Sequence, residues 1–266
     1  MGGINQFLLY DELPLWSAPF GLTLLDTIKL RKGINILDIG SGAGFPMLEI
    51  AERAGKSTMV YGIDPSEASI QMISEKIKLK GITNAIITQG VAEELPFDDH
   101  FFGLIVANNG INNVRDDQIV LSECFRVLSD QGQMVLTMNL PHTMIEFYEA
   151  FESVLHEHKM ESEVVLMNSH IQEKRKSIEF WKTTIETAGF IINSINVDGF
   201  RINFSDGTSF LEHYFVRTAF RKPWEKITNN PIIYKEVEDK LNRIAEIEGE
   251  LSISVPYVCF DCKKSN

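Results

Sequence analysis

The stretch that decides the fold is INILDIGSGAGFP, residues 34–46. An apolar, strand-forming run ends in Asp38 and gives way to Gly40, Gly42 and Gly44. Glycine lets the backbone turn sharply and lets a ligand approach the main chain closely. The stretch therefore predicts a buried strand, a tight loop at its carboxyl end, and a helix that begins where the stretch ends.

A second strand-forming run follows and ends in GIDP, residues 62–65. Asp64 would lie at the tip of that strand, where a carboxylate can bind the paired hydroxyls of a ribose. The glycine triplet is G-x-G-x-G with an acid two residues before it. It lacks the G-x-G-x-x-G spacing of a dinucleotide pyrophosphate site. The two runs together predict a nucleoside-binding site.

In both features the region 34–140 resembles the class I S-adenosylmethionine-dependent methyltransferases, in particular the branch that methylates small molecules. In that family the glycine loop passes under the methionine part of the cofactor, and the acid after the second strand holds the ribose. The resemblance implies methyl transfer from S-adenosyl-L-methionine to a small acceptor (EC 2.1.1.-). It assigns to the cofactor site Asp38, Gly40, Gly42, Asp64 and Pro65.

A third segment, GVAEELPFDDHFF at residues 90–102, resembles the signature with which the family contacts adenine. Ala92 and Glu93 take the matching positions. A small side chain lets the ring lie flat, and a carboxylate can accept a hydrogen bond from the exocyclic amine. A plain acidic loop before a turn is the alternative.

Two amide side chains follow the expected fourth strand in ANNGINNV, residues 107–114. Asn108 and Asn109 would lie at the carboxyl edge of the sheet, close to the methionine tail and the methyl group of the cofactor. Asn also tolerates unusual loop backbone angles, so ligand contact and a purely local role both stay open. The stretch lacks the Asp/Asn-Pro-Pro-aromatic sequence of the superfamily's amine-methylating nucleic-acid enzymes.

Aromatic residues precede the first strand in YDELPLWSAPFGLTLLD, which starts at residue 10. In the resembled enzymes such a leader often folds over the cofactor. Tyr10 and Trp16 could then shield the sulfonium, because aromatic faces attract a cation. A helix that packs on the core is the alternative.

Strand-type runs alternate with helical periodicity over the first half, which is typical of a parallel sheet with helices on both faces. The fold class expected is α/β, a Rossmann-like, seven-stranded, mostly parallel sheet in which two late strands form an antiparallel hairpin, as the resemblance implies. Strands are expected at 34–38, 59–64, 85–89, 104–107, 133–138, 190–197 and 253–260. Helices are expected at 46–54, 67–80, 117–127, 144–158, 173–188, 209–217 and 234–247.

The domain organisation expected is a single methyltransferase domain over residues 1–266, with a leader at 1–33 and a cofactor-binding core at 34–140. The two late strands are separated by far more residues than a hairpin connection needs. We interpret residues 198–251 as a helical cap inserted before the last strand. Ligands of parallel sheets bind beyond the carboxyl ends of the strands, so substrate choice is expected to depend on this cap.

Four polar residues are candidates for catalysis and acceptor binding. If the acceptor needs a general base, His213 and His142 are the first candidates. In the cap, Tyr214 and Arg217 are candidates for substrate binding, with Arg217 suited to an acid group. A histidine on a surface helix without a chemical role is the alternative for each imidazole.

The net charge and the cysteine content limit the kinds of ligand and partner that the protein is expected to bind. The formal net charge is −12, which disfavours nucleic acid and anionic membranes. The basic cluster at residues 174–176 is interpreted as a solvated helix face. Three cysteines indicate no disulfide framework, and Cys124, Cys259 and Cys262 are expected to be structural, with no metal site.

The start of the sequence lacks a basic region followed by an apolar core, and no apolar run is long enough to span a bilayer. A cytoplasmic protein is therefore expected. The oligomeric state stays open, a homodimer included. Two alternatives to the methyltransferase interpretation also stay open: a nicotinamide-dependent oxidoreductase, and a non-catalytic protein that binds S-adenosylmethionine or a partner.

Overall fold

The structure, a computed structural model, describes residues 14–265. The chain divides into two compact units, which are described separately. Among the described residues, the first unit comprises 14–138, 177–197 and 257–265, and the second comprises 139–176 and 198–256. The second unit therefore contains the expected cap together with a segment that follows the fifth strand.

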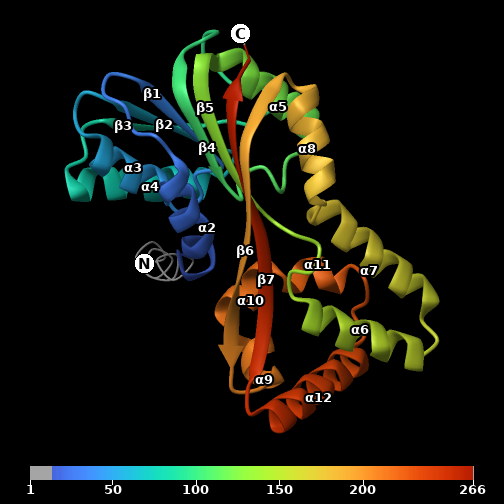
Figure 1. Cartoon of the computed structure of the whole chain (residues 1–266). Helices are drawn as coiled ribbons and strands as arrows, with labels where there is room; N and C mark the ends of the chain where they lie inside the picture. Colours follow the sequence, from blue (N-terminus) through green and yellow to red (C-terminus); the bar gives the residue numbers. More distant parts are fainter. Residues whose placement is uncertain (1–13, 266) are drawn as a thin grey trace. The chain divides into compact units, whose positions relative to one another are not determined.

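The sheet has seven strands within the described residues, in the order β3-β2-β1-β4-β5-β7-β6. The pairs β1–β2, β1–β4, β2–β3 and β4–β5 are parallel, whereas β6 and β7 run in opposite directions (Figure 1). This confirms the expected fold class. The strands are β1 (Asn35–Ile39), β2 (Met59–Asp64), β3 (Ala85–Gln89), β4 (Phe102–Asn108), β5 (Leu128–Asn139), β6 (Phe190–Phe204) and β7 (Leu251–Lys264).

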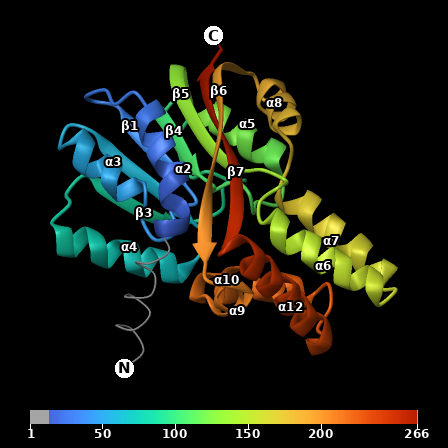
Figure 2. The same cartoon turned by 60° about the horizontal axis from the view of Figure 1, so that its bottom comes forward.

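Helices cover both faces of the sheet in the first unit. Figures 1 and 2 show α2, α3 and α4 on one face and α5 and α8 on the other. Side chains cap them where the sequence offers a hydroxyl or carboxylate: Ser66 accepts the N–H of Ser69, and Asp116 accepts that of Ile119. These helices are α2 (Pro14–Thr27), α3 (Met47–Ala54), α4 (Glu67–Lys80), α5 (Asp117–Val127) and α8 (Ile178–Thr187).

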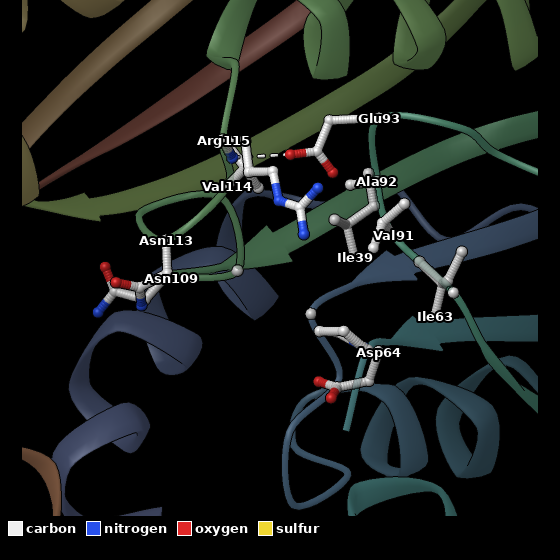
Figure 3. A pocket seen from close by; sticks show the side chains of 14 residues that line it. Ile39, Ile63, Asp64, Val91, Ala92, Glu93, Asn109, Asn113, Val114 and Arg115 are labelled. Carbon is white, nitrogen blue, oxygen red and sulfur yellow. Dashed lines mark hydrogen bonds between the residues drawn. The ribbon is translucent and has the colours of Figure 1, made fainter. Parts of the chain in front are cut away.

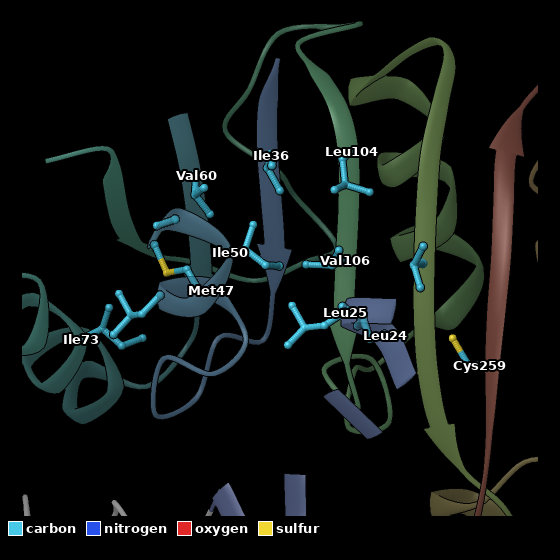
Figure 4. Packing of buried hydrophobic residues seen from close by; sticks show 13 residues of the cluster. Leu24, Leu25, Ile36, Met47, Ile50, Val60, Ile73, Leu104, Val106 and Cys259 are labelled. Atoms are coloured by element: carbon cyan, nitrogen blue, oxygen red, sulfur yellow. The ribbon is translucent and has the colours of Figure 1, made fainter. Parts of the chain in front are cut away.

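The core beneath α2 to α4 is a continuous apolar layer (Figure 4). Leu24 and Leu25 of α2 pack there with Ile50 of α3 and with Leu104 and Val106 of β4. The expected alternation of strands and helices therefore places the carboxyl ends of β1 to β4 at one edge, on a buried support. The part of the leader that forms α2 packs on the core, as expected in the alternative to a leader that folds over the cofactor.

The second unit is built around stacked aromatic rings. Phe147 lies 3.9 Å from Trp224 between ring centroids, with an interplanar angle of 21°, and Phe210 contacts both rings. Its helices are α6 (Ile145–Glu157), α7 (Glu161–Lys174), α9 (Gly207–Glu212), α10 (Tyr214–Ala219), α11 (Arg221–Glu225) and α12 (Pro231–Glu248).

Three expected elements differ from the structure. The helix expected at 173–188 does not form as one element, because α7 ends at Lys174 and Ser177 caps a new helix by accepting the N–H of Phe180. The helix expected at 209–217 is interrupted at His213, whose ψ of 131° is extended. The cap expected at 198–251 begins as a strand, since β6 continues to Phe204 before the helices start.

The interpretation of residues 174–176 as a solvated helix face is wrong at its central residue. Arg175 is only 3% exposed, because it follows the end of α7 and lies against the ring of Tyr148. Helical periodicity could not reveal this, since the helix stops before Arg175.

The three cysteines are free and buried. Burial raises the pKa of Cys124 to about 12 and that of Cys259 to about 11, so both stay protonated at neutral pH. Within residues 14–265, no group of three or more His, Cys, Asp or Glu side chains could hold a metal ion. None of the helices in the described part of the chain combines the length and the apolar character that a membrane crossing requires.

Candidate functional site

A pocket of about 410 Å³ opens in the first unit where the carboxyl ends of β1, β2, β3 and β4 meet (Figure 3). Its volume lies in the range of small-molecule and cofactor sites. The location is the edge at which parallel α/β sheets bind ligands. The lining residues are Ile39, Gly40, Ile63, Asp64, Pro65, Gly90, Val91, Ala92, Glu93, Asn109, Gly110, Asn113, Val114 and Arg115.

Asp64 ends β2 and places its carboxylate on the pocket wall (Figure 3). One oxygen, Oδ2, accepts the backbone N–H of Gly42 at 2.9 Å, and Oδ1 accepts that of Ser66 at 2.9 Å. Each carboxylate oxygen has two lone pairs, so both oxygens keep the capacity to accept from a ligand hydroxyl. The same hydrogen bonds fix the orientation of the carboxylate and tie the glycine loop to the neighbouring strand.

Asp38 differs from Asp64 in being closed off from solvent. It is 1% exposed, and neither carboxylate oxygen has a hydrogen-bond partner in the described part of the chain. Burial raises the pKa of Asp38 to about 7; the Ser41 hydroxyl opposes this rise and the charge of Asp64 adds to it. Asp38 is absent from the pocket lining, whereas Ile39 and Gly40, which follow it, are part of it.

Gly40 forms a cradle with Gly110 from the loop after β4. The φ of Gly40 is +70°, and its N–H donates to the carbonyl oxygen of Ile63 at 2.9 Å. A Cβ on Gly40 would stand 2.7 Å from the Cα of Gly110, which is closer than real contacts allow. Only glycine satisfies both conditions, so backbone without a side chain forms this part of the pocket wall. Gly42 also has a positive φ, but it lies outside the lining.

Glu93 connects the loops after β3 and β4. Its Oε1 accepts the backbone N–H of Arg115 at 2.7 Å (Figure 3). Ala92, beside it, is buried and contributes only a small side chain to the wall. The position of both residues agrees with the adenine-contacting role that the resemblance implies, and that role stays a prediction.

The two Asn residues after β4 have different surroundings. Asn109 lines the pocket with a φ of +59°, and its N–H donates to Thr137. Asn108 is absent from the lining: its Nδ2 donates to the carbonyl oxygen of Ser17 at 3.0 Å, and its Oδ1 accepts from the Thr137 hydroxyl at 2.8 Å. Asn108 thus anchors α2 to the end of β4.

Trp16, one of the two aromatic residues proposed for the leader, is not among the described residues that line the pocket. Trp16 is half-buried, with its ring 6.0 Å from that of Phe20. Tyr10 lies outside the described residues. The role of both residues as a shield of the sulfonium stays a prediction.

The residues proposed for catalysis and substrate binding all belong to the second unit, whereas the pocket belongs to the first. His142 is exposed, and His213 is exposed with its ring 5.5 Å from that of Phe204. Arg217 forms an ion pair with Glu212 at 3.6 Å, and Tyr214 begins α10. Their proposed roles stay predictions.

Several pocket residues were not predicted from the sequence. Gly110, Asn113 and Arg115 follow Asn109 in the loop after β4, and the glycine beside two Asn residues was the one local signal for a close approach. The apolar residues Ile39, Ile63 and Val91 carry no chemical signal. They line the pocket because they adjoin strand ends that the sheet brings together.

Known protein families and proteins resemble this chain in sequence and in fold. The profile of a family described as "Methyltransferase domain" matches residues 30–196, more than half of the chain. The demethylmenaquinone methyltransferase of Anoxybacillus flavithermus is 33% identical over 129 residues, which cover 47% of this chain and 54% of that protein. The protein of the same description from Lactococcus lactis is 30% identical over 149 residues, covering 56% and 58%.

The chain spans little more than half the length of these curated relatives. Among solved structures, the YcgJ protein of Bacillus subtilis superposes with a TM-score of 0.61 at 18% identity, covering 93% of this chain and 98% of that one. This likeness concerns the fold alone.

Proposed function

Because the chain belongs to the methyltransferase domain family, the class I S-adenosylmethionine-dependent methyltransferases, we propose that it transfers a methyl group from S-adenosylmethionine to a small-molecule acceptor. The observation that carries the proposal is the pocket at the carboxyl ends of β1 to β4, with the Asp64 carboxylate on its wall. Family membership favours this function over the nicotinamide-dependent alternative.

The residues present fit this cofactor. Asp64 offers free acceptor capacity for ribose hydroxyls, and the backbone of Gly40 and Gly110, packed too closely to admit a Cβ, forms part of the pocket wall. Asp38 precedes the glycine loop as a buried carboxyl whose oxygens have no partner among the described residues, and it lies behind the pocket lining rather than in it. In the proposed site Ala92 and Glu93 lie at the adenine, while Pro65 and Asn109 complete the wall.

The cofactor supplies an activated methyl group on a sulfonium. The protein therefore does not have to activate the donor; it has to bind the cofactor and the acceptor, orient them and exclude water. Positioning of two reactants can contribute about 7–11 kcal/mol to lowering the barrier. In this chain the orientation depends on Asp64, whose hydrogen bonds to Gly42 and Ser66 fix the carboxylate. If the acceptor loses a proton, we propose that His213 or His142 accepts it.

Calorimetric titration with S-adenosylmethionine tests the ribose assignment. Asp64→Ala should weaken binding at least 10-fold, because a hydrogen bond to a charged group contributes about 1.5–3 kcal/mol. Asp64→Asn removes the charge and one acceptor while keeping the size of the side chain. Its affinity for S-adenosylmethionine should lie between those of the wild type and Asp64→Ala. Asp98→Ala changes an exposed acid outside the pocket and should bind like the wild type. Unchanged affinity in a folded Asp64→Ala variant would refute the assignment.

Two further measurements address the alternatives. Thermal protection by S-adenosylmethionine but not by NAD(H) is expected, because a ligand stabilises only the folded state that binds it. Transfer of labelled methyl from S-adenosylmethionine to an acceptor in a cell extract would contradict the non-catalytic alternative. The acceptor panel should include a demethylmenaquinol, after the name of the curated relatives, and small acids, amines and alcohols.

A further inference from the structure

A buried arginine in the second unit has no acid partner among residues 14–265. Arg175 is 3% exposed, and its Nη1 atom is buried without a hydrogen-bond partner in the part of the chain that the structure describes. Its guanidinium carbon lies 4.8 Å from the centroid of the Tyr148 ring. A charged group removed from water is strongly disfavoured unless it is paired, and contact with a ring compensates only part of the loss.

The ring below Arg175 carries a second donor. The Tyr148 hydroxyl accepts a hydrogen bond from Nε1 of Trp224 at 3.0 Å, so its own proton remains available to a further acceptor. Tyr148 is 2% exposed and Trp224 is fully buried. The hydroxyl is therefore held in place by the packing of the aromatic rings around it. The guanidinium thus lies over a ring whose hydroxyl can still donate, and Nη1 of Arg175 has no acceptor among the described residues.

The surroundings of this pair are positively charged. Burial lowers the pKa of His170, and the charges of Arg175, Lys174 and Lys226 lower it further, against an opposing effect of Glu173. Glu173 is occupied with Lys174 in an ion pair of 3.2 Å. In a chain of net charge −12, this part of the second unit is thus locally cationic. Lys226, which acts on the same imidazole, is exposed.

We propose that the second unit binds a carboxylate or phosphate group of the acceptor through Arg175, with the Tyr148 hydroxyl as the second donor. The assignment of this anion to the acceptor rests on the proposed function. An anionic group would supply the partner that the buried guanidinium lacks, and arginine is the side chain whose planar fork matches carboxylate and phosphate oxygens. The site is distinct from the pocket of the first unit.

Anion titration of the full chain without cofactor tests the proposal. Inorganic phosphate and benzoate are titrated at constant ionic strength, with benzamide as the neutral counterpart of benzoate. Tryptophan fluorescence and the thermal midpoint are followed, because Trp224 contacts the Tyr148 hydroxyl. The wild type should give a saturable response to at least one anion and none to benzamide. If neither anion gives a saturable response, the proposal is overturned.

Matched variants test whether Arg175 is the residue that binds the anion. Arg175→Met keeps much of the buried volume without the charge and should weaken anion binding at least 10-fold. Arg243→Met removes an exposed arginine of the same unit and should leave the affinity unchanged. Equal anion affinity in Arg175→Met and the wild type would overturn the proposal. If Arg175→Met does not fold, Arg175→Lys takes its place, because lysine lacks the planar fork of arginine. An affinity for benzoate several-fold below that of the wild type supports the site. An affinity equal to that of the wild type overturns it.

Methyl-transfer kinetics link the site to the acceptor. For an acidic acceptor, Arg175→Lys should raise KM more than it lowers kcat, whereas for a neutral acceptor KM should not change. Methylation restricted to neutral acceptors would refute the link to the acceptor. Failure of the proposed function is a separate result, since absent methyl transfer and absent cofactor binding would leave the anion titration unaffected.

Discussion

The main chain of Gly110 passes so close to Ile39 that a Cβ on Gly110 would stand 1.9 Å from the carbonyl oxygen of Ile39. Gly110→Ala should therefore push the loop after β4 away from β1 and distort the pocket. We expect a loss of about 2–3 kcal/mol in the free energy of unfolding and at least 10-fold weaker cofactor binding, measured by urea unfolding and calorimetry. Gly199→Ala is the control, because its nearest neighbours lie at 3.4 Å and its φ is not positive; similar losses in both variants would contradict the close-packing argument.

The stability of the protein should depend on pH through Asp38. Burial raises its pKa from 3.8 to about 7 in the folded protein. Between these values the folded protein holds a proton that the unfolded chain has released, so this group makes the protein less stable as pH rises. Asp38→Asn removes the effect, and its free energy of unfolding relative to wild type should increase by about 3 kcal/mol from pH 5 to pH 8.

Urea unfolding without cofactor at the two pH values measures this difference. The exposed Asp98→Asn variant should keep the wild-type dependence on pH. A difference between Asp38→Asn and wild type that stays constant from pH 5 to pH 8 would show that Asp38 does not titrate in this range.

Glu93 should support cofactor binding by holding two loops together. Glu93→Ala removes the acceptor of the Arg115 N–H, which now lies 2.7 Å from Oε1. We expect the dissociation constant for S-adenosylmethionine to rise about 10-fold, in line with the loss of a charged hydrogen bond. Glu93→Gln keeps an acceptor and should lose less. Glu94→Ala, at the exposed neighbouring position, serves as the control in the same titration.

The link between Asn108 and Ser17 should hold α2 in place. Asn108→Asp keeps the oxygen that accepts from Thr137 but puts a charged oxygen where Nδ2 donates to the Ser17 carbonyl. Amide hydrogen exchange in residues 15–27 should become about 10-fold faster, since a lost buried hydrogen bond costs about 1–3 kcal/mol. Asn193→Asp, an exposed change in the same unit, should leave this exchange as it is; equal protection in Asn108→Asp would mean that packing alone anchors the helix.

The core of the fold was predictable because its signals are local. The strands ending at Asp38 and Asp64 and the helices α3 to α5 appear within one or two residues of their expected positions. Apolar runs, glycine turns and side-chain caps act over a few residues, so the sequence displays them directly. For the same reason Asp64 was identified as a pocket residue: an acid at a strand end has to lie at the edge where ligands bind.

The helices after β5 were less predictable. The helix expected at 173–188 is two helices separated at Arg175, and His213 interrupts another. Periodicity continues across both breaks, because a short irregular segment changes the direction of the chain without changing the pattern of apolar residues. Where the next helix begins is decided by a cap, such as Ser177, and by the packing of each piece.

By itself, the sequence determined the α/β sheet, its strand-loop-helix motif and the acid at the end of the second strand, because each depends on residues close together in the chain. Only the tertiary structure decided that Gly110 faces the glycine loop and that Arg175 is buried on Tyr148, with no acid partner in the described part of the chain. These relationships join residues that are distant in sequence, and their energies depend on burial and on close contact, which no local pattern encodes.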